Sequence, residues 1–350
     1  MIRLGVVGYG YWGPNIVRNF ADVPGCQLVA VSDMRAERLA LVRNRYPGVK
    51  TYADPNELVS DRRVDAVVIV TPVSTHYDLA MQALRAGKHV LVEKPLTSTS
   101  EQAARLVDEA ARRQLVLSVD HTFVYTGAVR KIRELIVNES LGDVYYYDSV
   151  RVNLGLFQHD VNVIWDLAVH DLAIMEHVLP SHPIAVSATG MSHVGNEPEN
   201  IAYLTLFFQD RLIAHLHVNW LAPVKVRRTL IGGSKKMIVY DDLEPSEKVK
   251  VYDKGVTLNG NGHGNGHGNG NNRYRMLIDY RSGDMCAPQL DITEALSIEA
   301  KHFIKCVETS QQTMTDGHAG LRVVRILEAA TASIAARGRV IELDAVGCAV

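Results

Sequence analysis

The first 120 residues alternate short apolar runs with longer amphipathic stretches. The runs are rich in β-branched residues and apolar at consecutive positions, as in strands of a parallel sheet that is covered on both faces. We expect six strands, the third of them short, at Ile2–Val7, Gln27–Ser32, Val49–Tyr52, Ala66–Val70, His89–Val92 and Val116–Val119. The stretches between them predict helices at Pro14–Phe20, Ala36–Tyr46, Pro55–Ser60, Tyr77–Ala86 and Ser100–Gln114. This repeated alternation predicts an α/β domain with right-handed crossovers over residues 1–120.

After Asp120 the pattern changes. A helix at Ala128–Asn138, a strand at Val144–Val152 and a longer helix at Val163–Leu179 come first. Consecutive strand-like runs with short links follow at Ala185–Thr189, Ala202–Phe208, Leu212–Trp220, Val226–Ile231, Met237–Asp241 and Val249–Asp253, and helices close the chain at Thr293–Thr309 and Gly317–Ala336. Neighbouring strands with short links are typical of an antiparallel sheet, so residues 121–350 predict an α+β domain.

Residues 259–272 consist of Gly and Asn with two histidines. This composition cannot bury a core or offset the entropy of ordering, so it predicts a flexible surface loop. His263 and His267 on such a backbone would make a weak metal site, and we expect no bound metal.

Composition narrows the class of protein. A length of 350 residues favours about two domains, and 47% hydrophobic with 22% charged residues is close to a globular average. A net charge of -2 gives no electrostatic reason to bind nucleic acid or an anionic membrane, and no apolar run is long enough to span a bilayer. The four cysteines are widely separated, and the N-terminus enters a strand pattern without a signal peptide. We therefore expect a cytoplasmic protein.

A glycine motif follows the first predicted strand. Gly8, Gly10 and Gly13 fit G-x-G-x-x-G around Tyr11 and Trp12, and Asp33 lies 20 residues beyond Gly13 at the end of the second strand. In this context the glycines allow a tight turn, backbone approach to a pyrophosphate and close packing of the helix. The constellation predicts a Rossmann domain. Asp33 would bind the adenosine ribose hydroxyls and repel a 2′-phosphate, which favours NAD over NADP.

The alternatives are a glycine-rich turn without a ligand, and accommodation of the 2′-phosphate of NADP by Arg35. The stretch Thr71–His76 follows the fourth strand, where loops line the ligand crevice of a parallel sheet. Its members Thr71, Ser74 and His76 are candidate cofactor contacts, although a hydroxyl there can equally cap the next helix.

Two further motifs supply candidate chemistry. Glu93-Lys94-Pro95 ends the fifth strand, so Lys94 is placed to hydrogen-bond a substrate hydroxyl; a surface lysine beside a glutamate is the alternative. Asp166 and His170 lie four residues apart on the predicted long helix and share one face. The carboxylate can orient the imidazole as a general base, although such a pair is also common as a purely structural feature.

Polar residues before this helix are candidates for a substrate pocket or are solvated loop residues. We expect substrate contacts from Tyr125, Arg151, Asp160 and Asn162, besides Lys94 and His170.

The chain resembles the Gfo/Idh/MocA oxidoreductases in the order of its motifs. These are the glycine motif, Asp33, the Thr71–His76 turn, Glu93-Lys94-Pro95 and the Asp166–His170 pair. The resemblance implies a Rossmann domain followed by a domain with an open, mainly antiparallel sheet. It implies that Lys94, Asp166 and His170 are the catalytic set, and that Glu93, Lys94 and Trp165 join the cofactor contacts. It also implies a homodimer or homotetramer.

Two stretches, Asp160–Asp166 and Val218–Arg227, resemble members that oxidise C3 of a UDP-linked N-acetylhexosamine or its uronic acid. Arg151, Lys225, Arg227 and Arg228 would supply positive charge to a diphosphate or a carboxylate, unless they are merely solvated. A free cyclitol or sugar dehydrogenase is the first alternative. A non-catalytic NAD-binding sensor is the second, since a fold does not by itself determine function.

Overall fold

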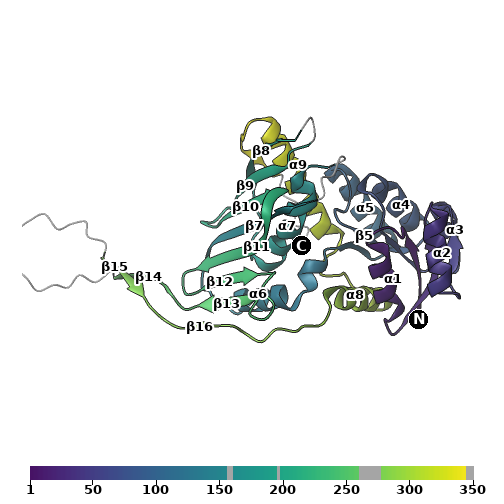
Figure 1. Ribbon diagram of the computed structural model, residues 1–350, viewed down its shortest axis with the longest axis horizontal. Coiled ribbons are helices and arrows are strands. Elements are labelled where there is room, and N and C mark those ends of the chain that lie inside the picture. Colours follow the sequence, from purple (N-terminus) through teal and green to yellow (C-terminus); the bar gives the residue numbers. More distant parts are fainter. Residues whose placement is uncertain (156–160, 195–197, 260–276, 344–350) are drawn as a thin grey trace, which may run out of the picture.

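The computed structural model describes residues 1–155, 161–194, 198–259 and 277–343, and it contains two large sheets with helices packed on them (Figure 1). The side chains of residues 257–259 and 277–279 are not described. Asp160 and all but the first residue of the predicted loop at 259–272 lie outside these ranges.

The N-terminal sheet is parallel, as the sequence predicts. Its strands are β1 (Ile2–Val7), β2 (Cys26–Ser32), β3 (Lys50–Tyr52), β4 (Ala66–Ile69), β5 (His89–Glu93) and β6 (Leu117–Asp120), in the spatial order β3-β2-β1-β4-β5-β6. The chain reverses its direction of winding between β1 and β4, which is where open parallel sheets form a ligand crevice. Every strand predicted here is confirmed to within one residue at each end.

Helices cover both faces of this sheet. On one face lie α3 (Pro55–Ser60), α4 (His76–Arg85) and α5 (Ser100–Arg113), and α2 (Ala36–Arg45) contacts the β2–β3 end. On the other face α1 (Gly13–Ala21) is joined by α8 (Ala295–Thr309), a helix from near the C-terminus. The rings of Phe20 and Phe303 meet edge to face with centroids 6.1 Å apart. The predicted boundary at residue 120 stays a prediction, but α8, which we assigned to the second domain, packs against the first.

The second sheet is mixed and mainly antiparallel. Its order is β16-β13-β12-β11-β7-β10-β9-β8-β17, and its one parallel pair is β7 with β10. The strands are β7 (Val144–Leu154), β8 (Ala185–Met191), β9 (Ile201–Phe207), β10 (Ile213–Asn219), β11 (Leu221–Gly233), β12 (Met237–Asp241), β13 (Val249–Tyr252), β16 (Met285–Cys286) and β17 (Ile341–Glu342). A separate hairpin, β14 (Gly255–Asn259) with β15 (Leu277–Arg281), extends away from the body (Figure 1). The sequence did not predict β14 to β17.

Three helices, α6 (Gly127–Val137), α7 (Val169–Val178) and α9 (Gly317–Ala335), supply the apolar residues that cover one face of this sheet. The opposite face leaves Tyr203 and Ile213 more than 40% exposed. α9 also packs against α5, so the end of the chain contacts both domains.

No helix of the described residues is long and apolar enough to cross a membrane.

The predicted long helix at Val163–Leu179 is not uniform. Residues Ile164–Ala168 form a π-helical turn, and the α-helix proper, α7, begins at Val169. A π turn is wider than an α turn, so side chains four residues apart no longer share the spacing of an α-helical face. This alters the expected relation between Asp166 and His170.

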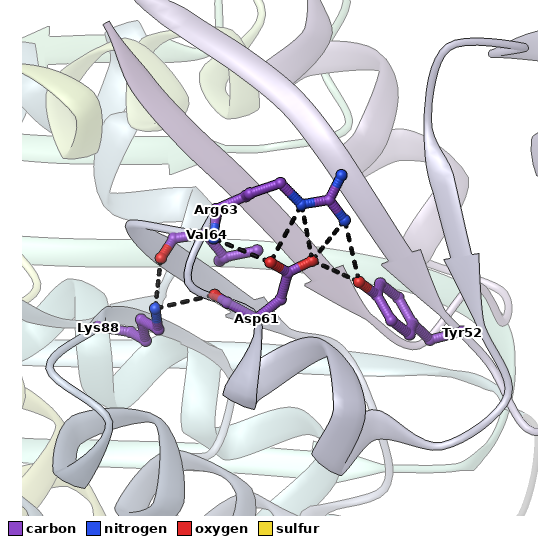
Figure 2. Close-up of polar contacts among 5 residues, drawn as sticks. All are labelled: Tyr52, Asp61, Arg63, Val64 and Lys88. Carbon is purple, nitrogen blue, oxygen red and sulfur yellow. Dashed lines mark hydrogen bonds and ion pairs between the residues drawn. The ribbon is translucent and has the colours of Figure 1, made fainter.

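A polar anchor holds the loop that precedes β4, at the edge of the sheet opposite the crevice (Figure 2). The Asp61 carboxylate accepts hydrogen bonds from Arg63 and from the Tyr52 hydroxyl, and together they hold the pKa of Asp61 well below its usual value. The buried Lys88 ammonium donates to the backbone oxygens of Asp61 at 3.0 Å and Val64 at 2.6 Å. The amino ends of β4 and β5 are thereby tied together.

Because α8 completes a face of the parallel sheet, Phe303→Ala is expected to lower the free energy of unfolding by about 3–5 kcal/mol. The lost ring is 1% exposed in the wild type and leaves a cavity against Phe20. Urea denaturation followed by circular dichroism would measure the change. Ile292→Ala, at a side chain that is 97% exposed, is the control and should change stability by less than about 0.5 kcal/mol. Equal effects of the two substitutions would contradict the packing of α8.

Candidate active site

A cleft of about 720 Å³ follows the carboxyl ends of β1, β2 and β4. It is where the topology predicts ligand binding. Six of the predicted cofactor residues line it, namely Gly8, Gly10, Tyr11, Asp33, Thr71 and Ser74.

Each glycine of the motif is required for a different structural reason. Gly8 has φ +100, and a Cβ there would lie 2.2 Å from the Val70 oxygen, so no other residue fits. A Cβ on Gly13 would lie 2.4 Å from the oxygen of Gly8, which shows how closely α1 packs on the turn. A Cβ on Gly10 would meet only the Arg35 guanidinium, at 3.5 Å. Gly10 therefore leaves the backbone open toward the cleft.

Asp33 is held in place at the end of β2. Its carboxylate accepts hydrogen bonds from the backbone N–H groups of Tyr9 at 2.8 Å and Arg35 at 2.9 Å, and the Arg35 guanidinium pairs with it at 3.2 Å. Burial alone would raise the pKa of Asp33, but these hydrogen bonds outweigh it and lower the pKa. The group is thus a carboxylate at neutral pH.

Six predicted cofactor residues do not line the cleft: Gly13 packs against the glycine turn, Trp12, Glu93 and Lys94 line a second cavity, and His76 and Trp165 are engaged elsewhere. His76 is 1% exposed, and its ring nitrogens contact the backbone oxygens of Pro95 at 2.9 Å and Thr71 at 2.8 Å. It links the turn after β4 to the turn after β5. Trp165 packs between the cores of the two domains, with its indole N–H donating to Thr331 at 3.0 Å.

A second cavity of about 730 Å³, here called the reaction cavity, adjoins the cleft at Tyr11, which lines both. It lies between the carboxyl ends of β5 and β6 and the start of α7. Its lining residues are Tyr11, Trp12, Glu93, Lys94, Asp120, Thr122, Phe123, Thr126, Asp166, His170 and Arg227. All three predicted catalytic residues are among them.

Lys94 and Asp166 form the closest contact in this set. The Lys94 ammonium donates to the backbone oxygen of Asp166 at 3.1 Å and lies 3.7 Å from its carboxylate. The other carboxylate oxygen accepts from the Trp220 indole at 3.0 Å. Among the described residues no hydrogen bond joins Asp166 to His170, and the carboxylate contacts Lys94 and Trp220 instead, so the role of Asp166 in orienting His170 stays a prediction.

His170 lies against Phe123, with ring centroids 5.0 Å apart in an edge-to-face arrangement. Burial, and then the positive charge of Lys94, lowers the pKa of His170 well below its usual value. Its imidazole is neutral at pH 7 and can accept a proton, which is the form a general base needs.

An acidic wall bounds the reaction cavity at β5 and β6. Burial, followed by the nearby Asp120 carboxylate, raises the pKa of Glu93 to about 8. Asp120 accepts hydrogen bonds from the Trp12 indole at 2.9 Å and from Thr122. Asp120, Thr122 and Thr126 were missed by sequence reasoning. Asp120 could have been found, since it is the last residue of β6 and strand ends line the crevice.

Three predicted substrate residues are engaged elsewhere. Tyr125 is 1% exposed, and its hydroxyl pairs with Thr315 at 3.1 Å. Arg151 is 3% exposed and forms a two-pronged ion pair with Asp171 at 2.7 and 3.1 Å. Asn162 accepts hydrogen bonds from the backbone N–H groups that begin the π turn, of Ile164 and Trp165. None of the three lines the reaction cavity.

Arg227 does line it. Its guanidinium pairs with Asp242 at 3.1 Å and lies 5.6 Å from the centre of the Phe123 ring. It brings a cation from β11 to the side of the cavity opposite the parallel sheet.

Comparisons with known proteins agree with this geometry. Residues 2–121 match an oxidoreductase family with an NAD-binding Rossmann fold, and residues 129–239 match the GFO/IDH/MocA C-terminal domain. The chain is 30% identical over 263 residues to an uncharacterized oxidoreductase of Escherichia coli, which covers 71% of this chain and 73% of the relative.

The relatives with named activities include a sugar-nucleotide dehydrogenase and an inositol dehydrogenase. A UDP-N-acetylglucosamine 3-dehydrogenase of Acidithiobacillus ferrooxidans is 29% identical over 328 residues, covering 92% of this chain and 94% of the relative. A solved structure of that dehydrogenase superposes with a TM-score of 0.77 at 26% identity, over 96% of this chain and 98% of the other. A myo-inositol 2-dehydrogenase of Thermotoga maritima is 25% identical over 73% of this chain and 79% of the relative.

The first matched segment contains the parallel sheet, and the second contains much of the mixed sheet. Residues of both matched segments line the reaction cavity. The chain belongs to the Gfo/Idh/MocA family of NAD-binding oxidoreductases.

Proposed function

We propose that this oxidoreductase uses NAD to oxidise a secondary ring hydroxyl of a nucleotide sugar, at C3 of a UDP-N-acetylhexosamine or its uronic acid. The observation that carries the proposal is the placement of Lys94, Asp166 and His170 on one cavity that adjoins the dinucleotide cleft. A hydroxyl in that cavity would meet a hydrogen-bond donor and a neutral imidazole together.

The cleft residues fit NAD. The open side of Gly10 and the N-terminus of α1 suit a pyrophosphate, and the Asp33 carboxylate suits the ribose hydroxyls. Arg35 is already paired with Asp33, so it offers less to a 2′-phosphate, which favours NAD over NADP. When bound, NAD supplies the nicotinamide carbon that accepts the hydride.

The side chains of the reaction cavity supply position and proton transfer. Lys94 would donate a hydrogen bond to the oxygen of the reacting hydroxyl while Asp166 holds the ammonium in place. His170 would accept the hydroxyl proton as the hydride leaves the ring carbon. Lys94 acts on the oxygen and His170 on the hydrogen of the same hydroxyl group. The orientation of the two side chains therefore contributes directly to the rate.

A negatively charged substrate is favoured by Arg227, which brings a cation into the cavity. A diphosphate or a uronic carboxylate would pair with it. The likeness to a UDP-N-acetylglucosamine 3-dehydrogenase over 92% of the chain supports the same class. The alternative is a free cyclitol, supported by the likeness to a myo-inositol 2-dehydrogenase over 73% of the chain.

We also propose a homodimer or homotetramer. The face of the mixed sheet away from the helices exposes aromatic and aliphatic side chains, including Tyr203 and Ile213. Burying such a face against a second copy would remove apolar surface from water.

The substrate class is tested by following NADH absorbance with NAD and a panel of UDP-N-acetylhexosamines, their uronic acids, free inositols and free hexoses. Reduction with a UDP-linked sugar alone is the expected result, because Arg227 adds positive charge to the cavity beside which a diphosphate would lie. Reduction with free inositol alone would replace the proposal by the cyclitol alternative.

Lys94→Ala is expected to lower kcat by roughly 10²- to 10⁴-fold, because the hydroxyl loses its donor. The affinity for NAD, measured by the quenching of tryptophan fluorescence, should stay within a few-fold of the wild type. Lys131→Ala on α6, where the lysine pairs with Glu134 near the surface, is the matched control and should leave kcat unchanged. Wild-type turnover in Lys94→Ala would refute the assignment.

Since His170 acts as the neutral base, protonation should abolish oxidation, and its lowered pKa places that loss below pH 6.5. The logarithm of kcat/KM for the alcohol is therefore expected to stay level as the pH falls from 7.5 to 6.5 and to decline only in more acidic buffer. His170→Gln should lose most activity and this acid limb. An acid limb centred at or above pH 6.5 would contradict the role.

A further inference from the structure

A third cavity, of about 380 Å³, lies beside α7 and is separate from the cleft and the reaction cavity. Its walls come from α6, α7, α9 and the segments that follow β6 and α8. Its charged and titratable members are His121, Arg133, Glu176, His177, His182 and Arg322. None of these groups has a part in the proposed reaction.

His121 forms the wall between the third cavity and the reaction cavity. It lines the third cavity, while its chain neighbours Asp120 and Thr122 line the reaction cavity. The side chain is 2% exposed, and neither ring nitrogen has a hydrogen-bond partner within the described residues. A buried imidazole without a partner is costly, so its presence calls for an explanation.

α7 runs along both cavities. His170 lines the reaction cavity, and Ala173, Glu176 and His177 line the third cavity. His170 and His177 are seven residues apart, which is about two turns of the same helix face and roughly 10 Å along its axis. The two cavities thus follow one another along α7, with His121 packed beside it.

The third cavity leads from the buried His121 to the surface. At its outer end the His182 side chain is 54% exposed and Met314 is 40% exposed. Beside His182, the Glu176 carboxylate pairs with His182 at 2.8 Å and Arg322 at 2.7 Å through one oxygen, and its other oxygen is buried without a hydrogen bond to the described residues. Proton acceptors therefore line the cavity from the inside to the outside.

The protonation state of His121 suits transfer in two directions. Burial, and then the charge of Lys94, lowers its pKa to about 3, so the ring is neutral. A neutral imidazole has one N–H donor and one acceptor nitrogen. If one nitrogen accepts a proton as the other releases one, the ring passes a proton along without becoming charged.

We propose that His121 relays the proton taken up by His170 into the third cavity, from which it reaches solvent past Glu176 and His182. This inference rests on the proposed function. In the balanced step the hydroxyl loses its proton to His170 and its carbon loses a hydride to NAD. His121 then accepts a proton from the side of His170 and gives one up on the other side, so His170 returns to its neutral form and one proton enters solvent.

The test compares wild type, His121→Ala and His121→Phe in weak buffer, with NAD and whichever of UDP-N-acetylglucosamine or myo-inositol the wild type oxidises. Both variants are expected to lose about tenfold or more in kcat. A first turnover of NADH should survive, because His170 still accepts one proton. Added imidazole should restore turnover in His121→Ala, where it fits the vacated space, and not in His121→Phe.

His318→Ala, at an exposed histidine of α9, is the control and should behave as wild type with and without imidazole. Wild-type turnover of both His121 variants in weak buffer would overturn the relay while leaving the proposed function standing. A loss of turnover that imidazole does not restore in His121→Ala would also overturn it, since a structural role predicts that result. If the wild type oxidises neither compound nor any other member of the panel, the proposed function fails and the relay with it.

Should the His121 variants fail to fold, as judged by their thermal unfolding, Ala173→Leu provides the second test. It narrows the third cavity without changing either histidine. Slower turnover in weak buffer is expected, and unchanged turnover would overturn the relay.

Discussion

The contact between Lys94 and Asp166 is the interaction on which the arrangement of the active site depends. Lys94 directly follows strand β5 of the parallel sheet, and Asp166 lies in the π turn that precedes α7 in the second domain. The pair forms only when the two domains are packed together. An ammonium in this partly buried position would be costly without a carboxylate, so the ion pair couples the packing of the domains to the completion of the cavity.

The two sheets constrain where chemistry can occur. Helices cover both faces of the parallel sheet, which leaves the carboxyl ends of its strands as the open edge, and the cleft and reaction cavity both lie there. α8 and α9 come from the end of the chain and pack on opposite faces of this sheet. Because α9 also covers the mixed sheet, this helix contacts both of the domains that form the cavity.

The π turn at Ile164–Ala168 contains Asp166, and the Asp166 carboxylate contacts Lys94 and Trp220. Burial, and then the positive charge of Lys94, lowers the pKa of His170. A histidine beside a carboxylate would have a raised pKa and would be charged over part of the physiological range. Burial together with the charge of Lys94 keeps the imidazole neutral, and π turns are frequent at functional sites.

The sequence by itself determined the parallel sheet, the glycine turn and the strand-end positions of Asp33 and Lys94. Buried strands are continuous apolar runs, and the residue that ends such a run lies at the crevice, so these features depend on local pattern alone. Only the tertiary structure decided that Tyr125, Arg151 and Asn162 do not line the cavity, since a polar residue has the same local pattern whether it is engaged within the protein or meets a ligand. The partner of Asp166, the return of α8 to the first domain and the place of His121 between two cavities all depend on contacts between segments far apart in the chain, which no local pattern encodes.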